Sequence, residues 1–495
     1  MTNDLLLPLP IVLSLASAAL SLGLGRRPRV QRALGLLTLL VVLGVTIALV
    51  LKIDDGSVIA TEIGDWGSPL GIVLALDLLA GLLLTVSLVV LIIVLVFTIG
   101  STRPIDQGRF FYPVYMVMAA GVAACFLTAD LFNLFVAFEV TLTASYVLIA
   151  IGRSREQVRH GITYVVISLL ASSLFISAIA IAYAATGTVN LADLADKLGA
   201  IDPGLRTALG SLFLVVFGIK AAIFPLFFWL PDSYPIAPAP VTAIFAGLLT
   251  KIGVYAIIRS QSLLFAGSEG SQFLLTVAAL TMLVGVLGAI AQDDVMRVLS
   301  FHIVSQIGYL IFGLGLLTLA GLSATVFSAI HHILITTTLF MIGGLIEFAS
   351  GTGALRHLGG MIRTTPVLAV LFMITALSFA GVPPFSGFLA KLAVIQAGLE
   401  VGAYLTVGVG LLVSILTVFS MMKIWSGAFW GDPEDPTAEE RARTHRLPPV
   451  MVGVTAIAVV LGIGIAVGAG PLYELSERAA TSLVDPASYM TAVGR

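Results

Sequence analysis

The sequence predicts an all-α protein that crosses a membrane many times. Of its 495 residues, 59% are hydrophobic and only 11% are charged, whereas soluble domains carry about 25% charged residues. Apolar runs of about 20 residues, the length that a membrane-spanning helix needs, recur along the whole chain. Inside some of these runs stand single lysines and a glutamate, which are costly in hydrocarbon and are therefore candidates for function.

The apolar runs predict about fourteen transmembrane helices. The first begins near Leu5 and continues past Leu22 without a small-residue cleavage site, so we expect a retained helix and not a signal peptide. The twelfth is too long for one straight helix and is interrupted by Gly-Val-Pro-Pro-Phe-Ser-Gly at 381–387. The predicted spans lie near residues 4–24, 33–52, 76–100, 109–127, 130–151, 160–185, 208–233, 238–260, 272–291, 297–317, 323–348, 366–399, 403–429 and 449–469.

Several classes of protein are excluded by what the sequence lacks. Its single cysteine, Cys125, lies in an apolar run, so neither a disulfide framework nor a cysteine metal site is expected. The chain has no phosphate-binding loop, dinucleotide fingerprint or lipidation motif. The sequence therefore predicts a transporter in a lipid bilayer and not an enzyme, with no cofactor, no metal and no nucleic-acid partner.

The basic residues of the connections indicate the orientation. When alternate connections are grouped, one side has fifteen arginines, and the opposite side, with both termini, has six lysines and arginines. Because cytoplasmic loops carry the excess of basic residues, both termini are predicted to lie on the non-cytoplasmic side of a bacterial-type plasma membrane, the cell membrane.

The order of the spans predicts two inverted repeats. Spans four to eight and nine to thirteen form two sets of five, and an odd number per repeat gives the repeats opposite orientations. The fourth span of each set is broken, at Pro225 in the first and at Pro383-Pro384 in the second. The predicted organisation is a three-helix segment (1–108), a first repeat (109–261), a second repeat (272–430), a cytoplasmic loop (431–448), and a C-terminal helix and tail (449–495).

Glu139 and Lys220 are the first candidate site residues, since both stand in the middle of a predicted span. Pro225 removes a backbone donor five residues after Lys220 and frees a carbonyl, and a broken helix beside a charge is typical of ion sites in transporters. Burial favours the neutral form of both groups, whereas their mutual attraction favours the charged forms. The pair is therefore predicted to hold and release a proton. The alternative is a static ion pair.

Two further lysines and three histidines extend this set. Lys251 is the predicted central relay residue, although it could instead only keep a hydrated cavity open. Lys391, just past the double proline, is the matching candidate in the second repeat, with a similar alternative. His331 and His332 are adjacent, and His302 belongs to a polar helix. Histidine can pass protons near neutral pH, so His332 and His302 are candidates, with buried hydrogen-bonding groups as the alternative. Their spacing fits no metal motif.

The remaining charges in or beside the spans are interpreted as structural. Arg259 and Asp77 stand near span ends. Lys423 lies near the end of its span among tryptophans, so its side chain is expected to extend toward the membrane interface.

Four stretches together resemble the antiporter-like subunits shared by Mrp-type cation/proton antiporters, respiratory complex I and membrane-bound hydrogenases. The resemblance covers nearly the whole chain. It is carried by DLFNLFVAFEV (130–140), GIKAAIFPLFFWLPDSYPIAPAPVTAIFAGLLTKIGVYAIIR (218–259), QDDVMRVLSFHIVSQIGYL (292–310) and PPFSGFLAKL (383–392).

This resemblance implies which residues carry protons. By their positions, Glu139, Lys220, Lys251 and Lys391 match the glutamate of the fifth span and the lysines of the seventh, eighth and twelfth spans. The family pattern implies a half-channel to Glu139 and Lys220, a hydrated central axis, and a second half-channel at Lys391. Thr336 departs from it, because many relatives have a lysine four residues after the second histidine; this gives His332 and bound water a larger part.

The expected function is proton translocation within a hetero-oligomer of membrane subunits that exchanges Na⁺ for H⁺. One alternative is a proton-pumping subunit of a redox-driven complex, which would have the same local chemistry. Another is a scaffold whose site is vestigial. The sequence of this chain alone does not distinguish the antiporter subunit from the redox-driven proton pump.

Overall fold

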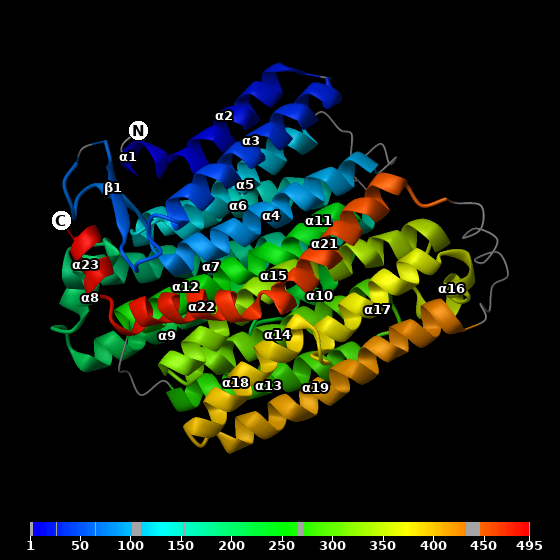
Figure 1. Cartoon of the computed structure of the whole chain (residues 1–495). Helices are drawn as coiled ribbons and strands as arrows, with labels where there is room; N and C mark the ends of the chain where they lie inside the picture. The colour runs from blue at the N-terminus through cyan, green and yellow to red at the C-terminus, as the bar shows by residue number, and fades with distance from the viewer. Residues whose placement is uncertain are drawn as a thin grey trace.

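The computed structural model describes residues 3–25, 27–64, 66–100, 110–151, 155–265, 271–431 and 446–494. Within them, eleven helices are long and apolar enough to cross a membrane, and three more apolar helices, Leu9–Gly23, Phe111–Leu127 and Pro366–Ala380, are shorter. Each of the predicted spans is helical, so the predicted all-α polytopic fold is confirmed. Figure 1 shows most of these helices running side by side in one bundle.

The first half of the chain contains the helices α1 (Asn3–Leu6), α2 (Leu9–Gly23), α3 (Pro28–Val50), α4 (Leu78–Gly100), α5 (Phe111–Leu127), α6 (Leu131–Ala150), α7 (Arg155–Thr186), α8 (Leu191–Leu198), α9 (Pro203–Ala221), α10 (Trp229–Ser233), α11 (Ala239–Ile244) and α12 (Thr250–Arg259), with π-helical segments η2 (Phe245–Leu249) and η3 (Ser260–Leu264). The second half contains α13 (Ser271–Ile290), α14 (Val295–Gly315), α15 (Leu319–Ser350), η4 (Leu355–His357), α16 (Met361–Thr364), α17 (Pro366–Ala380), α18 (Ser386–Glu400), α19 (Tyr404–Ile424), η5 (Trp425–Trp430), α21 (Pro449–Val467), α22 (Ala469–Val484) and α23 (Ala487–Val493).

A small β-hairpin is an element that the sequence analysis missed. β1 (Ile59–Ile63) and β2 (Ile72–Leu76) pair antiparallel, with Ile59 opposite Leu76 and Ile63 opposite Ile72. The backbone N–H of Ala129 donates to the carbonyl of Val73 at 2.9 Å, so the hairpin is attached to the end of α5. The hairpin and both ends of the chain lie at the same end of the bundle (Figure 1), which we call the hairpin end.

Two matching backbone bridges relate the five-helix repeats. Asp130 caps α6 and pairs with Asn190 after α7, and Asp294 caps α14 and pairs with Ala354 after α15. Each bridge has two backbone hydrogen bonds of 2.8 and 2.9 Å. Five membrane crossings separate the two aspartates, so the bridges lie at opposite ends of the bundle. The repeats are therefore inverted.

The fourth span of each repeat is broken, as expected. α9 ends at Ala221, the next residue, Ala222, adopts a left-handed conformation (φ 60°), and the chain resumes as the short α10. α17 ends at Ala380 and is capped by Gly381 (φ 87°), and α18 continues the span. Lys220 therefore lies in the last turn before one break, and Lys391 lies in the second turn after the other.

The middle of the bundle is formed by α15, which is buried along almost its whole length. The C-terminal segment 449–494 is helical, including the part expected to be a tail, and α23 returns to the hairpin end. There the carbonyl of Val493 accepts hydrogen bonds from Ser68 Oγ at 3.2 Å and Asn190 Nδ2 at 3.4 Å.

The structure tests one part of the predicted orientation, namely that the two termini lie at the same end of the bundle. Both termini lie at one end, but which side of the membrane that end faces stays a prediction. Most of the predicted loop 431–448, namely 432–445, lies outside the described residues, as do several of the basic residues on which the orientation was based, Arg26, Arg103, Arg109, Arg153, Arg441, Arg443 and Arg495.

Candidate functional site

Glu139 and Lys220 lie close together, joined through a serine that the sequence analysis did not identify. Ser172 of α7 donates its hydroxyl hydrogen to Glu139 Oε1. Lys220 Nζ donates to Ser172 Oγ at 3.1 Å and to the carbonyl of Ser168 at 3.5 Å. The arrangement is a hydrogen-bonded chain from an ammonium to a carboxylate. Lys220 is buried, whereas Glu139 is only half-buried and lies toward the outer face of the bundle.

The end of α9 holds Lys220 in this position. A lysine in the last turn of a helix faces the negative end of the helix dipole, which favours its charged form. The break frees backbone carbonyls, and the indole Nε1 of Trp229 donates to one of them, that of Ile219, at 3.0 Å. The Lys220 ammonium also lies 5.6 Å from the centre of the Phe138 ring, a cation–π geometry.

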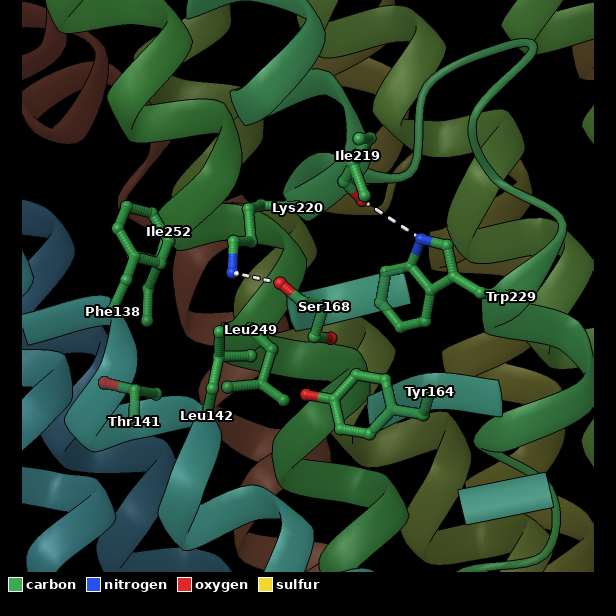
Figure 2. A pocket seen from close by; sticks show the side chains of 10 residues that line it. All are labelled: Phe138, Thr141, Leu142, Tyr164, Ser168, Ile219, Lys220, Trp229, Leu249 and Ile252. Atoms are coloured by element: carbon green, nitrogen blue, oxygen red, sulfur yellow. Dashed lines mark hydrogen bonds between the residues drawn. The ribbon is translucent and has the colours of Figure 1, made fainter. Parts of the chain in front are cut away.

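A small cavity adjoins the ammonium of Lys220. Its volume of about 20 Å³ is enough for roughly one water molecule. Figure 2 shows Lys220 pointing toward the backbone carbonyl of Ser168, with Tyr164 and Trp229 on one side and Leu249 and Ile252 on the other. Those last two residues flank Lys251, so the cavity extends from the first lysine toward the helix that carries the second.

Lys251 is buried next to a π-helical segment. Its Nζ donates to the carbonyl of Ala246 in η2 at 2.7 Å. An ammonium has three donors, and within the described residues Lys251 has no carboxylate at ion-pair distance. π-Bulges are frequent at functional sites, and this one places a carbonyl at the ammonium of a mid-membrane lysine.

Lys391 uses the break of the second repeat in a similar way. Its Nζ donates to the carbonyl of Ala380, the last residue of α17, at 2.8 Å. The ammonium lies 4.9 Å from the centre of the Tyr309 ring, and the hydroxyl of Tyr309 donates to the carbonyl of Gly410 at 2.5 Å. Both repeats thus place a buried lysine beside a broken helix, but only in the second does a carbonyl freed by the break accept directly from the lysine.

The three histidines gather around the second break. Rings of His302 and His332 lie 5.6 and 6.3 Å from the ring of Phe379 in α17. His331, which the sequence analysis noted but did not select, contacts Ser386 at the start of α18, with Nδ1 2.9 Å from Oγ. Its ring centre is 4.9 Å from that of His332. The serine in the stretch 383–392 was the signal that could have pointed to His331.

Buried polar atoms without a protein partner stand at the start of α12 and along α14 and α15. Within the described residues they are Thr250 Oγ1, Gln306 Nε2 and Oε1, His302 Nδ1, His331 Nε2, His332 Nδ1 and Thr336 Oγ1. Buried polar groups are rarely left unpaired, and water commonly satisfies them. One of these atoms belongs to Thr336, which stands where many relatives have a lysine. The polar side chains in this region are therefore compatible with a hydrated axis.

Lys423 extends to the exposed connection after α13, which agrees with the expectation that it reaches toward the end of its span. Its ammonium turns to the end of α13, where it donates to the carbonyls of Ile290 and Gln292 at 3.0 and 2.6 Å and to Asp293 Oδ1 at 2.9 Å. Unpaired carbonyls at a helix end attract a cation. This hydrogen bond also lowers the pKa of the exposed Asp293 carboxyl below its ordinary value.

Arg259 and Asp77 form a buried ion pair, which their positions near separate span ends did not indicate. Arg259 Nη1 lies 2.7 Å from Asp77 Oδ2, and Nη2 donates to Oδ1 at 2.9 Å. The side chains are 7% and 3% exposed.

Comparisons with known proteins agree with this architecture. Residues 128–417 match the family model described as NADH:quinone oxidoreductase/Mrp antiporter, TM. The chain is 39% identical over 494 residues to the D-type Na(+)/H(+) antiporter subunit of Alkalihalophilus pseudofirmus, covering 99% of both chains. This confirms the resemblance, and the similarity to an antiporter subunit of the D type extends over the full length.

Two solved structures have the same fold. A chain of the Mrp complex from Dietzia sp. DQ12-45-1b superposes with a TM-score of 0.94 at 34% identity, covering 100% of both chains. A chain of the membrane-bound sulfane sulfur reductase, an archaeal respiratory membrane complex, superposes with a TM-score of 0.90 at 26% identity over 99% of this chain and 100% of that one. The chain therefore belongs to the transmembrane family shared by NADH:quinone oxidoreductases and Mrp antiporters.

Proposed function

We propose that this chain is the proton-translocating subunit of a multisubunit Na⁺/H⁺ antiporter in a bacterial-type plasma membrane. The observation that carries the proposal is the hydrogen-bonded chain from Lys220 through Ser172 to Glu139, next to a broken helix. A proton that leaves the ammonium can pass along the serine hydroxyl to the carboxylate. This leaves a neutral amine and a neutral carboxylic acid, the forms that burial favours.

From this pair the proton path continues toward the second repeat. Lys251 lies beyond the cavity at Lys220, and the partnerless polar atoms around Gln306, Thr336 and His332 provide sites for water between Lys251 and Lys391. Lys391 at the second break is the outlet in this proposal. His332 and His302 act as hydrogen-bonding groups along the axis, and His331 links the axis to the break through Ser386.

Partner subunits are part of the proposal. Glu139 is half-buried in this chain although it lies at membrane depth, where an unsatisfied charge is costly. The helix pair that carries it exposes an apolar face with Phe132, Val136 and Leu169. A neighbouring membrane subunit at this face would cover the carboxylate and provide the route by which ions reach it. The similarity to a chain of the Mrp complex supports such an assembly.

The second candidate is a proton-pumping subunit of a redox-driven complex, and the likeness to the sulfane sulfur reductase chain favours it. The local proton chemistry would be the same. Identity of 39% to an antiporter subunit against 26% to the reductase chain supports the antiporter. The gene neighbours separate the two hypotheses: small antiporter subunits in one case, hydrophilic iron–sulfur subunits in the other.

Alanine variants of the pair test the proposal. Lys220→Ala and Glu139→Ala should abolish Na⁺-driven proton movement in membrane vesicles while the complex still assembles, because each change interrupts the hydrogen-bonded chain. The measurements are dye-monitored internal pH and the amount of complex in the membrane. Full exchange by either assembled variant would show that the pair is structural.

A further inference from the structure

The face of α12 that carries Lys251 leads to the buried ion pair at the hairpin end. Lys251, Tyr255 and Arg259 are spaced by four residues, so they lie on one face of the helix. With a rise of 1.5 Å per residue, Arg259 is about 12 Å from Lys251 along the helix axis. A proton at Lys251 therefore has a short polar route to the hairpin end unless something closes it.

Arg259 fills this route with a fixed and buried charge. Its two hydrogen bonds to Asp77 tie the end of α12 to the start of α4. A further hydrogen bond, from Nη2 to the hydroxyl of Tyr255 at 3.3 Å, continues to the carbonyl of Phe126, to which Tyr255 donates at 2.9 Å. Every polar group on this part of the face is held by another protein group, apart from the buried Nε of Arg259.

Two tyrosine rings enclose the guanidinium. Its central carbon lies 5.4 Å from the ring centre of Tyr255 and 4.7 Å from that of Tyr489, within the range of cation–π contacts. Tyr489 is itself 3% exposed and belongs to α23, the last helix of the chain. A cavity of about 310 Å³ lies between the hairpin and the end of α23 at Val493. The same short helix therefore lines this cavity and contacts the guanidinium through Tyr489.

Among the described residues, the basic side chain at the equivalent end of the second repeat is not enclosed by aromatic rings as Arg259 is. Both fifth spans end in a basic residue followed by a π-helical segment: Arg259 before η3, and Lys423 just before η5. Each lies by the end of the first helix of its own repeat, since Tyr255 donates to Phe126 of α5 and Lys423 to Ile290 of α13. The Lys423 side chain is 29% exposed, compared with 7% for Arg259. The repeats are therefore closed differently at corresponding ends.

We propose that Arg259, Asp77 and Tyr489 form a seal that prevents protons on Lys251 from leaving at the hairpin end, so that they continue to the second repeat. The inference rests on the proposed function, since it takes protons to move along the lysines. A fixed arginine side chain is an electrostatic barrier to protons in other membrane pores. α23 stabilises this barrier by placing Tyr489 against it. These three side chains are positioning residues and do not themselves carry the transported proton.

Variants of Tyr489 in the assembled complex test the seal. A pH gradient is imposed on vesicles without Na⁺, and its decay is followed with a pH-sensitive dye. Tyr489→Ala removes the ring and should make the decay several-fold faster than in wild type. Tyr489→Phe keeps the ring over the guanidinium and should behave like wild type. Ser488→Ala, a change of an exposed residue on the same helix, is the matched control and should also behave like wild type.

The route of the leak is tested by a second change. Lys220→Ala in the Tyr489→Ala background should return the decay to the wild-type rate, because the leaking protons enter through Lys220. A leak that persists in the double variant would overturn the proposal, and so would wild-type tightness of assembled Tyr489→Ala. Tyr489→Leu, which keeps an apolar side chain but no ring, is the second variant and should leak as well. If vesicles with the assembled Tyr489→Leu complex held the pH gradient as long as wild type, the proposal would also be overturned.

The two proposals fail in different ways. If Lys220→Ala alone retained Na⁺-driven exchange, the proposed function would be wrong whatever the decay rates. If Lys220→Ala abolished exchange while no Tyr489 variant leaked, the relay would stand and the seal would be rejected.

Discussion

At the scale of single residues, the proposed proton transfer depends on a serine between two charges. A hydrogen bond to a charged group contributes about 1.5–3 kcal/mol, and Ser172 makes one with each of Glu139 and Lys220. It also keeps the two charges from collapsing into a tight ion pair. A buried pair in direct contact would be hard to separate, whereas a bridged pair can exchange a proton through the hydroxyl.

The first prediction concerns this bridge. Ser172→Ala removes the hydroxyl and should reduce the rate of Na⁺-driven proton movement by about tenfold or more, since 1.4 kcal/mol corresponds to a factor of ten. Ser172→Thr keeps the hydroxyl and should retain most activity. The rates are measured in vesicles and normalised to the amount of complex.

Ser173 provides the control for that experiment. It is the next residue of α7, is exposed, and bonds only within its own helix, to the carbonyl of Leu169. Ser173→Ala should leave the rate unchanged. Equal activity of the Ser172→Ala and wild-type complexes would mean that Glu139 and Lys220 exchange protons without the serine.

The sequence identified the lysines, but not all of their partners. Lys220, Lys251 and Lys391 stand out because a charge in an apolar run is rare. Ser172 does not, because serines are common in these helices and only the facing of α7 toward α6 and α9 distinguishes it from Ser173. The buried Arg259–Asp77 pair was missed for a related reason: 182 residues separate its members, and no periodic pattern connects residues that far apart.

At the scale of elements, each repeat has a backbone bridge and a broken fourth span. Its fifth span ends in a basic residue that is buried in the first repeat and partly exposed in the second. The spans and the breaks followed from hydropathy and proline, which act locally. The bridges and the hairpin did not, because they depend on backbone groups that meet across the chain. The contact of Lys423 with the end of α13 also depends on tertiary structure, because the free carbonyls at the end of one helix accept hydrogen bonds from a lysine of another helix.

The contact of Lys423 with Asp293 makes a prediction about pH. The pKa of Asp293 is lowered in the folded protein, first by its hydrogen bond with Lys423. The contact therefore stabilises the fold at any pH above the ordinary aspartate pKa of about 3.9. That contribution is lost as the pH falls through the lowered pKa.

Asp293→Asn should consequently lower the unfolding temperature at neutral pH. The difference from wild type should disappear in acid, where the wild-type carboxyl is also neutral. Thermal unfolding of the purified complex in detergent at several pH values measures this. A difference that stays constant down to the most acidic sample would show that the ion pair has no part in it.

At the scale of the whole molecule, the proposed relay runs along two inverted repeats, with one half-buried carboxylate, Glu139, at its edge. Glu139 is engaged with Ser172 and Lys220, so it is a poor ligand for Na⁺ at the same time. Net exchange needs a second ion site with access to both sides of the membrane. We therefore assign proton movement to this chain and expect the cation pathway to involve partner subunits.

The purified chain should accordingly be silent by itself. Reconstituted alone in liposomes under a Na⁺ gradient, it should produce no Na⁺-dependent change of internal pH, whereas the complete complex should. The control is the same preparation reassembled with its partner subunits. Robust exchange by the single chain would identify it as a self-contained antiporter.

The most direct test of the account is Lys220→Arg in the complete complex. Arginine keeps the positive charge and can donate to Ser172, but a guanidinium stays protonated at physiological pH and cannot release its proton. If Lys220 only fixed Glu139 electrostatically, the arginine would replace it. The account predicts that Na⁺-driven proton movement by the assembled Lys220→Arg complex is lost almost as fully as in Lys220→Ala. Exchange at the wild-type rate by the arginine variant would contradict it.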